Sequence, residues 1–203
     1  MSPRPYALGA RAAAVADTRE RVVIAARELF SEGGFHRVPI DEVARRADVA
    51  RATVYHQFGS KLGLLEAVLV DSEHRADLPA LANVIQHTPP DKLLRATISD
   101  GCRYWSTDPQ LARKIIGLGA VDPDASALLA GHDAGRLQLL TTTVRRLADA
   151  NLLRPGCPTG RALDILWLLT SFDTYDQLTR GRNLTPAEAA DILVALASGP
   201  LMS

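Results

Sequence analysis

Apolar residues recur at spacings of three and four along most of this chain, and glycine and proline residues fall between the resulting runs. Such spacing places apolar side chains on one face of an α-helix, whereas a half-buried strand needs strict alternation. No alternating run of useful length is present. The sequence therefore predicts an all-α protein of about nine helices, in which an N-terminal three-helix unit precedes a larger helical bundle.

The first two predicted helices lie before residue 48. The first is expected to begin at Asp17, where Glu20 three residues later completes a capping box, and to end at Gly33. The second has Pro39 in its first turn, a position that needs no backbone N–H donor. Its apolar positions repeat at helical spacing and its charged positions face out, so we expect two to three amphipathic turns.

The third predicted helix runs from about Arg51 to Gln57. Gly59 ends this helix, and Ser60 caps a long fourth helix that is directed toward Pro79. Short helices joined by a tight turn between the second and the third are the outline of a helix-turn-helix unit.

The third helix carries the candidate nucleic-acid contacts. Val54 must point toward the core, so its polar neighbours turn outward. Arginine can bond a guanine edge, a methyl group can meet a thymine methyl, and hydroxyl groups can bind phosphates. At the start of the next helix, an ammonium and free backbone N–H groups both favour a phosphate. The candidate DNA-binding residues are Arg51, Ala52, Thr53, Tyr55, His56 and Lys61.

Charge is distributed unevenly although the formal net charge is zero. Residues 1–65 hold ten Arg or Lys against seven Asp or Glu, a surplus of three positive charges that the rest of the chain cancels. A polyanion would therefore meet the N-terminal end first. Taken singly, Tyr55, His56 and Lys61 could equally be ordinary surface residues.

The segment "RVVIAARELFSEGGFHRVPIDEVARRADVARATVYHQFGSKLGLLEAV" resembles the DNA-binding domain of the TetR family of bacterial transcriptional repressors. The resemblance covers about fifty contiguous residues, and "TVYHQFGSK" is its most specific part. It implies that Arg51, Ala52 and Tyr55 approach base edges, while Thr53, His56 and Lys61 hold the sugar-phosphate backbone. It also implies a palindromic double-stranded operator and a repressor that a small-molecule effector releases.

Three positions depart from the family pattern. Val38 and Pro39 replace a usual threonine, Asp48 replaces the usual turn glycine, and Ala50 replaces the usual serine cap. Aspartate tolerates a left-handed backbone, so Asp48 is compatible with the turn. A missing cap at Ala50 should cost about 1 kcal/mol of local helix stability. The missing threonine removes one expected phosphate contact, and we expect this loss and the missing cap to affect operator contact in detail and not to abolish the unit.

The C-terminal part predicts a dimer. Residues 159–180 contain "ALDILWLLTSF", apolar almost all round, and residues 185–199 open with the capping box "TPAE". Two such helices suit a four-helix interface between two copies, and the resemblance implies a homodimer through the same helices. A dimer would match two half-sites about 34 to 36 Å apart. The alternative is a helix that is fully buried in a monomer core.

Polar or aromatic residues that interrupt apolar stripes are the candidates for an effector site. Asp173 stands out because it lies in the middle of the apolar helix 159–180, where an unpaired carboxylate is costly. Each candidate has a plainer alternative, such as core packing for Trp105 or an ion pair with Arg180 for Asp176. The candidates are Tyr104, Trp105, His132, Arg136, Phe172, Asp173, Tyr175 and Asp176.

These assignments divide the chain into three parts: residues 1–16 as a flexible arm, residues 17–65 as the DNA-binding domain, and residues 66–203 as the effector-binding and dimerisation domain. No catalytic, metal-binding or cofactor motif is present, and no apolar stretch is long enough to span a membrane, so we expect a cytoplasmic protein that is not an enzyme. Two rival hypotheses remain. One is an enzyme or carrier with a vestigial N-terminal domain, and the other is an interaction module that never binds DNA.

Overall fold

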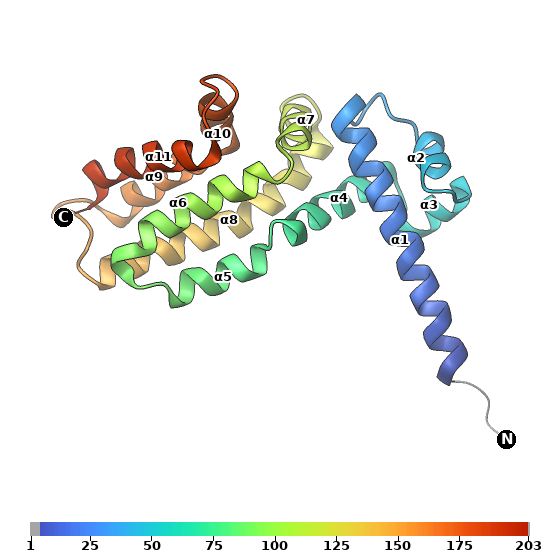
Figure 1. Ribbon diagram of the computed structural model, residues 1–203, viewed down its shortest axis with the longest axis horizontal. Helices are drawn as coiled ribbons and strands as arrows, with labels where there is room; N and C mark the ends of the chain where they lie inside the picture. Colours follow the sequence, from blue (N-terminus) through green and yellow to red (C-terminus); the bar gives the residue numbers. More distant parts are fainter. Residues whose placement is uncertain (1–4, 203) are drawn as a thin grey trace. The chain divides into compact units, whose positions relative to one another are not determined.

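The computed structural model describes residues 5–202, with side chains for residues 12–78 and 80–202 (Figure 1). Regular secondary structure in this part is helical, apart from an isolated antiparallel bridge between Leu153 and Met202, so the predicted all-α class is confirmed. Its helices are α1 (Pro5–Gly33), α2 (Ile40–Arg46), α3 (Arg51–Phe58), α4 (Lys61–Arg75), α5 (Leu78–His87), α6 (Pro90–Ser106), α7 (Pro109–Gly119), α8 (Pro123–Asp149), α9 (Thr159–Leu169), α10 (Phe172–Thr179) and α11 (Pro186–Leu201).

The chain forms two compact units. The N-terminal unit comprises the residues up to Asp71 together with Arg113–Ser126, and the bundle unit comprises Ser72–Ala112 and the residues from Ala127 onward. The expected division at residue 65 stays a prediction.

The N-terminal unit is built around apolar side chains from its first four helices. Phe30 on α1, Val43 on α2 and Leu64 on α4 are fully buried, and Val54 on α3 is 1% exposed. Helix α2 packs against both α1 and α3. The predicted core position of Val54 is thus confirmed.

Helix α1 begins earlier than the sequence predicted. The expected start at Asp17 is wrong, because the helix already runs from Pro5. Instead of completing a capping box with Glu20, Asp17 lies 3.3 Å from Arg21 one turn later. Residues 12–17 are exposed, so this stretch has no apolar face from which a helix could be predicted. Its alanines favour the helix through their high intrinsic helix propensity. Residues 1–4 of the expected arm lie outside the described residues.

Two further differences explain why residues 5–202 form eleven helices where about nine were expected. The predicted fourth helix ends at Arg75, because Asp77 adopts a left-handed conformation with φ of 55° and starts α5. Helix α5 then packs on the bundle core through Leu81 and Ile85. The predicted helix 159–180 is also interrupted, since α9 ends at Leu169 and Ser171 caps α10.

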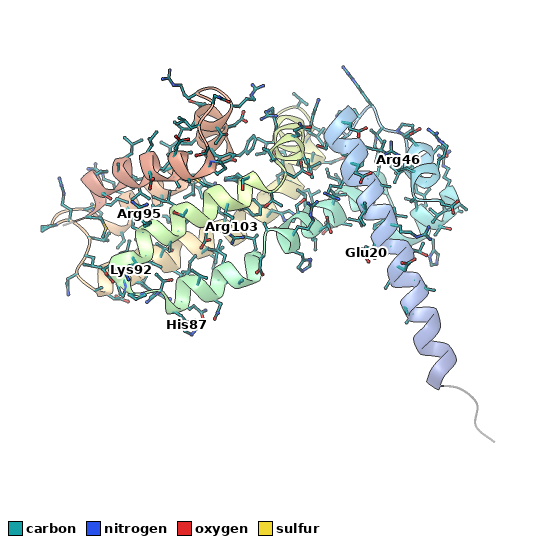
Figure 2. The ribbon with its side chains drawn as sticks, viewed as in Figure 1. Glu20, Arg46, His87, Lys92, Arg95 and Arg103 are labelled. Atoms are coloured by element: carbon teal, nitrogen blue, oxygen red, sulfur yellow. The ribbon has the colours of Figure 1, made fainter. Side chains whose placement is uncertain are left out.

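Helices α6 and α11 pack against each other in the bundle unit and lie side by side in Figure 1. The buried face of α11 includes Ala189, Leu193 and Ala197, whose small and medium side chains permit this approach. Arg95 on α6, labelled in Figure 2, donates to Asp191 on α11 at 2.6 Å. The predicted capping box of Thr185 and Glu188 is confirmed.

No helix among the described residues has the length and apolar character that crossing a bilayer requires.

Candidate nucleic-acid interface and effector site

The turn between α2 and α3 is made by backbone conformation. Asp48 has a φ of 53°, as the sequence predicted for a left-handed turn residue, and the Val49 N–H donates to the Ala44 carbonyl at 3.0 Å. Ala50 stands at the N-cap of α3 in an extended conformation, without a side-chain hydrogen bond. The helix starts without an acidic residue in its first turn, so its side chains leave the positive end of its dipole uncompensated.

The turn between α3 and α4 is equally tight. Gly59 has a φ of 71°, and the Ser60 hydroxyl accepts a hydrogen bond from the Gly63 N–H at 3.0 Å, so the predicted cap at Ser60 is confirmed. A Cβ atom at Gly63 would lie 2.2 Å from the Phe58 carbonyl oxygen. Only glycine therefore lets α4 start so close to the end of α3, and this closeness fixes Lys61 beside the third helix.

The polar side of α3 is presented outward. Val54 and Phe58 are buried, and Arg51, Ala52, Tyr55 and His56 are exposed, while Thr53 is half-buried. Of the six candidate DNA contacts, five lie on this helix as expected, and Lys61 begins the next one.

Arg51 is held by two neighbours. Its Nη1 lies 3.1 Å from an Asp41 carboxylate oxygen on α2, and its guanidinium lies 5.4 Å from the centre of the Tyr55 ring. The Tyr55 side chain, and after it the Asp41 carboxylate, raise the pKa of Arg51. The sequence placed Asp41 on the outer face of its helix but gave it no role, because a contact between residues ten apart on different helices has no local signal.

Lys61 is half-buried and points across the N-terminal unit. Its Nζ donates to the His36 carbonyl oxygen at 3.4 Å and lies 4.6 Å from the centre of the Phe35 ring. Burial lowers the pKa of Lys61. The position of the ammonium is therefore set before any ligand arrives, as suits a residue that binds a phosphate.

Arg19 is a further cation near α3 that the sequence did not single out. Its guanidinium lies 4.5 Å from the centre of the Phe58 ring and donates to the Gln57 carbonyl at 3.2 Å. It thereby neutralises the carbonyl end of α3, which is a structural role typical of a cation at a helix C-terminus.

Four of the eight effector candidates form a chain of ring contacts in the bundle unit. The Tyr104 and Trp105 rings on α6 lie 4.6 Å apart, Trp105 lies 5.4 Å from Phe172, and Phe172 lies 6.4 Å from Tyr175 on α10. Phe172 and Tyr175 are each 4% exposed, so they are core residues. Burial, and then the carboxylates of Glu73 and Asp133, raise the pKa of Tyr104 to about 12.

Arg136 and Trp105 bind the backbone at the break between α9 and α10. Arg136 donates to the Trp167 carbonyl at 3.1 Å and to the Thr170 hydroxyl at 3.2 Å, and its guanidinium stacks 3.6 Å from the centre of the Trp167 ring. The Trp105 indole N–H donates to the Thr170 carbonyl at 2.9 Å. Burial lowers the pKa of Arg136, although Asp133 opposes this effect.

The remaining polar candidates have distinct surroundings. His132 lies 2.6 Å from Glu73, and Asp176 lies 3.5 Å from Arg180, which is the ion pair that the plainer alternative predicted. Asp173 is exposed in the first turn of α10. Its expected place in the middle of an apolar helix is therefore wrong, since Ser171 begins a new helix just before it.

A groove of about 360 Å³ lies between α8 and α9 in the bundle unit, apart from these residues. Its lining consists of Thr141, Val144, Arg145, Ala148, Asp149, Thr159, Gly160 and Leu163. None of the eight effector candidates belongs to it. Among the described residues, no group of three His, Cys, Asp or Glu side chains could hold a metal ion.

Comparison with known proteins places the N-terminal segment among bacterial regulators. The family model described as "Bacterial regulatory proteins, tetR family" matches residues 23–68. The HTH-type transcriptional regulator UidR of Escherichia coli K12 is 39% identical over 59 residues, which are 29% of this chain and 30% of UidR. The match thus spans less than a third of the length of this relative.

Other similarities extend further. The transcriptional repressor KstR of Rhodococcus jostii is 28% identical over 152 residues, 75% of this chain and 70% of KstR. Among solved structures, GusR of Salmonella enterica has a TM-score of 0.71 at 22% identity and covers 91% of this chain and 95% of its own. NalD of Pseudomonas aeruginosa, the secondary repressor of the MexAB-OprM efflux pump, has a TM-score of 0.70 with the same identity and coverage. GusR and NalD thus share the fold of this chain.

Proposed function

Because the chain belongs to the TetR family of bacterial transcriptional regulators, we propose that it binds a palindromic double-stranded operator and represses transcription until a small-molecule effector releases it. The observation that carries this proposal is the exposed polar face of α3, with Arg51 beside Tyr55 and with Lys61 at the start of α4. A helix of this kind fits the major groove, where side chains reach base edges while flanking groups bind phosphates.

Selection from a randomised library of double-stranded DNA tests the DNA-binding step directly. We expect the purified protein to enrich a roughly palindromic sequence, and footprinting around its own coding region to show protection of a related site. Binding should weaken steeply between about 50 and 200 mM salt, because phosphate contacts release counterions. An interaction module that never binds DNA would enrich no sequence, and an enzyme or carrier would show turnover or ligand transport instead.

Arg51 and Lys61 are expected to contribute differently. Arg51→Ala should remove discrimination of about 1–3 kcal/mol at one base pair of each half-site. Lys61→Ala should weaken binding to all sequences alike and lower the salt slope by about one. Fluorescence anisotropy on the selected duplex and its single-base variants separates the two effects. An equal loss in both variants with unchanged base preference contradicts the role of Arg51.

Exposed apolar residues on α9 and α11 support a homodimer. Leu168 is 64% exposed and Leu196 57%, and Ile192 lies one turn before Leu196 with 39% exposure. A second copy would cover them by a two-fold symmetric contact. We expect Leu196→Asp to shift the protein to monomer in analytical ultracentrifugation. The matched control is Val121→Asp, an apolar residue of 76% exposure in the N-terminal unit, which should leave the dimer intact.

We propose that the effector binds in the bundle unit beside Tyr104 and His132. Tyr104 begins the chain of ring contacts, and His132 lies 2.6 Å from Glu73, whose carboxylate contributes to the raised pKa of Tyr104. Helix α4 runs from Lys61 in one unit to Arg75 in the other, and we propose that it transmits the change. An effector that weakens DNA binding a hundredfold must itself bind the DNA complex a hundredfold more weakly, a coupling of about 2.7 kcal/mol.

Two variants distinguish this location from the α8–α9 groove. Tyr104→Phe removes one hydroxyl group and should reduce effector affinity. Gly160→Leu would fill the groove, since a Cβ atom at Gly160 meets nothing within 4 Å, and it should leave effector affinity unchanged. The readout is release of labelled operator during a screen of small molecules. The reverse pattern would place the effector in the groove.

A further inference from the structure

A carboxylate lies on the surface that the proposed function turns toward DNA. The Asp41 side chain is 63% exposed and lies next to Arg51, the first residue of α3. A free negative charge there would repel phosphates and lower affinity for every sequence. Its presence therefore requires an explanation other than attraction to the polyanion.

The N-terminus of α3 supplies such an explanation. Ala50 gives the helix no side-chain cap, and its first turn contains no acidic residue. The positive charge of Arg51 thus adds to the positive end of the helix dipole, which is an unfavourable combination. The Asp41 carboxylate, reaching across from α2, places a negative charge beside both.

The same contact restricts where the guanidinium can lie. The Asp41 carboxylate binds Nη1 at 3.1 Å, while the Tyr55 ring, one helical turn along, lies 5.4 Å from the guanidinium carbon. Arginine has five N–H donors in a planar fork, so its other donors are still available to a base edge. A free arginine side chain carries about 2 kcal/mol of rotamer entropy, part of which a preset conformation removes before binding.

We propose that Asp41 is a positioning residue that holds Arg51 for one base pair and so raises sequence preference at the expense of overall affinity. This inference rests on the proposed function as a DNA-binding protein. The opposing hypothesis is that Asp41 only occupies Arg51 until a phosphate displaces it. In that case Asp41 would change the affinity for all DNA sequences by the same factor.

The chain offers a matched control for the charge. Glu42 lies next to Asp41 on α2 but pairs with Arg45 of the same helix. Asp41→Asn and Glu42→Gln each remove one negative charge from α2, and both should raise affinity for unselected DNA by a similar factor. Only Asp41→Asn removes a partner of Arg51.

The experiment compares wild type, Asp41→Asn, Glu42→Gln, Arg51→Ala and the double variant Asp41→Asn with Arg51→Ala. Each full-length protein is titrated with the library-selected duplex and with the duplex altered at the base pair where Arg51→Ala loses preference. We expect Asp41→Asn to lower the ratio of the two affinities about fivefold, the low end of what one bidentate contact confers. Glu42→Gln should leave the ratio unchanged, and the double variant should match Arg51→Ala alone.

The outcomes separate this inference from the proposed function. If Asp41→Asn leaves the ratio unchanged, or if the double variant loses more preference than Arg51→Ala alone, Asp41 does not act through Arg51. If wild type enriches no sequence at all, the proposed function fails instead. Thermal melts of each variant identify any general loss of folding, which we do not expect because the Asp41 side chain is exposed.

Discussion

The α3–α4 junction and the α9–α10 junction each join two helices through two residues, by different means. At the first, Gly59 takes a positive φ of 71°, and Gly63 leaves room for the Phe58 carbonyl. At the second, Thr170 has a φ of −95° that any residue can adopt. There the freed carbonyls are bound by side chains, among them Arg136 from α8 and Trp105 from α6.

This difference separates two ways of ending a helix. The α3–α4 junction is made by residues within five positions of one another, since Gly59 has a positive φ and Gly63 lacks the Cβ atom that would meet the Phe58 carbonyl. The α9–α10 junction depends on partners 31 and 65 positions away in the sequence. A substitution should therefore disrupt the α3–α4 junction by steric overlap within the junction. The α9–α10 junction should be disrupted by the loss of hydrogen bonds from distant residues.

The largest expected effect is at Gly63. Gly63→Ala places a Cβ atom 2.2 Å from the Phe58 carbonyl oxygen, and because the obstacle is backbone, the turn itself must shift. We expect a loss of about 3–5 kcal/mol in the free energy of unfolding, measured by urea denaturation followed by circular dichroism. Gly117→Ala, in α7 of the same unit with nothing within 4 Å, should instead stabilise by about 0.5–1 kcal/mol. Similar values for both variants would contradict the steric account.

An intermediate effect is expected at Arg136. Arg136→Met keeps the length of the side chain but leaves the Trp167 carbonyl and the Thr170 hydroxyl without this donor, at a cost of about 2–3 kcal/mol. The melting temperature should fall by roughly 4–12 °C, since about 2–4 °C corresponds to each kcal/mol at this chain length. Arg145→Met, an exposed change on the same helix, is the control. An unaltered melting temperature for Arg136→Met would show that the break does not depend on this contact.

The smallest effects are expected at the N-caps of α10 and α3. The Ser171 hydroxyl accepts from the Thr174 N–H at 3.3 Å and donates to the Leu168 carbonyl at 2.8 Å, so Ser171→Ala should cost about 1 kcal/mol. Ala50 has a suitable extended conformation but no cap bond, so Ala50→Ser should add about 0.5–1 kcal/mol. Thermal denaturation measures both. If Ala50→Ser did not raise the stability, the backbone N–H groups at the start of α3 would already be hydrogen-bonded to other groups.

The sequence by itself determined much of the N-terminal motif. Periodicity assigned Val54 to the core and residue type assigned Ser60 to a cap, whereas the resemblance to the TetR pattern marked Asp48 as the turn residue and Ala50 as an uncapped helix start, and each is found in the structure. The first two assignments depend on helical periodicity and on the capping preference of a single residue. Both are properties of neighbours in the chain, so they can be inferred from the sequence before the fold is known.

Tertiary structure alone decided the break at Ser171, the contact of Asp41 with Arg51 and the clustering of Tyr104, Trp105 and Phe172. The stretch "ALDILWLLTSF", apolar almost all round, favoured one helix over 159–180, and the side chains that bind the carbonyls at its break come from other helices. A local pattern cannot report such partners, because their hydrogen bonds exist only once distant segments have packed together. For the same reason, the local pattern could not show that Asp173 is exposed.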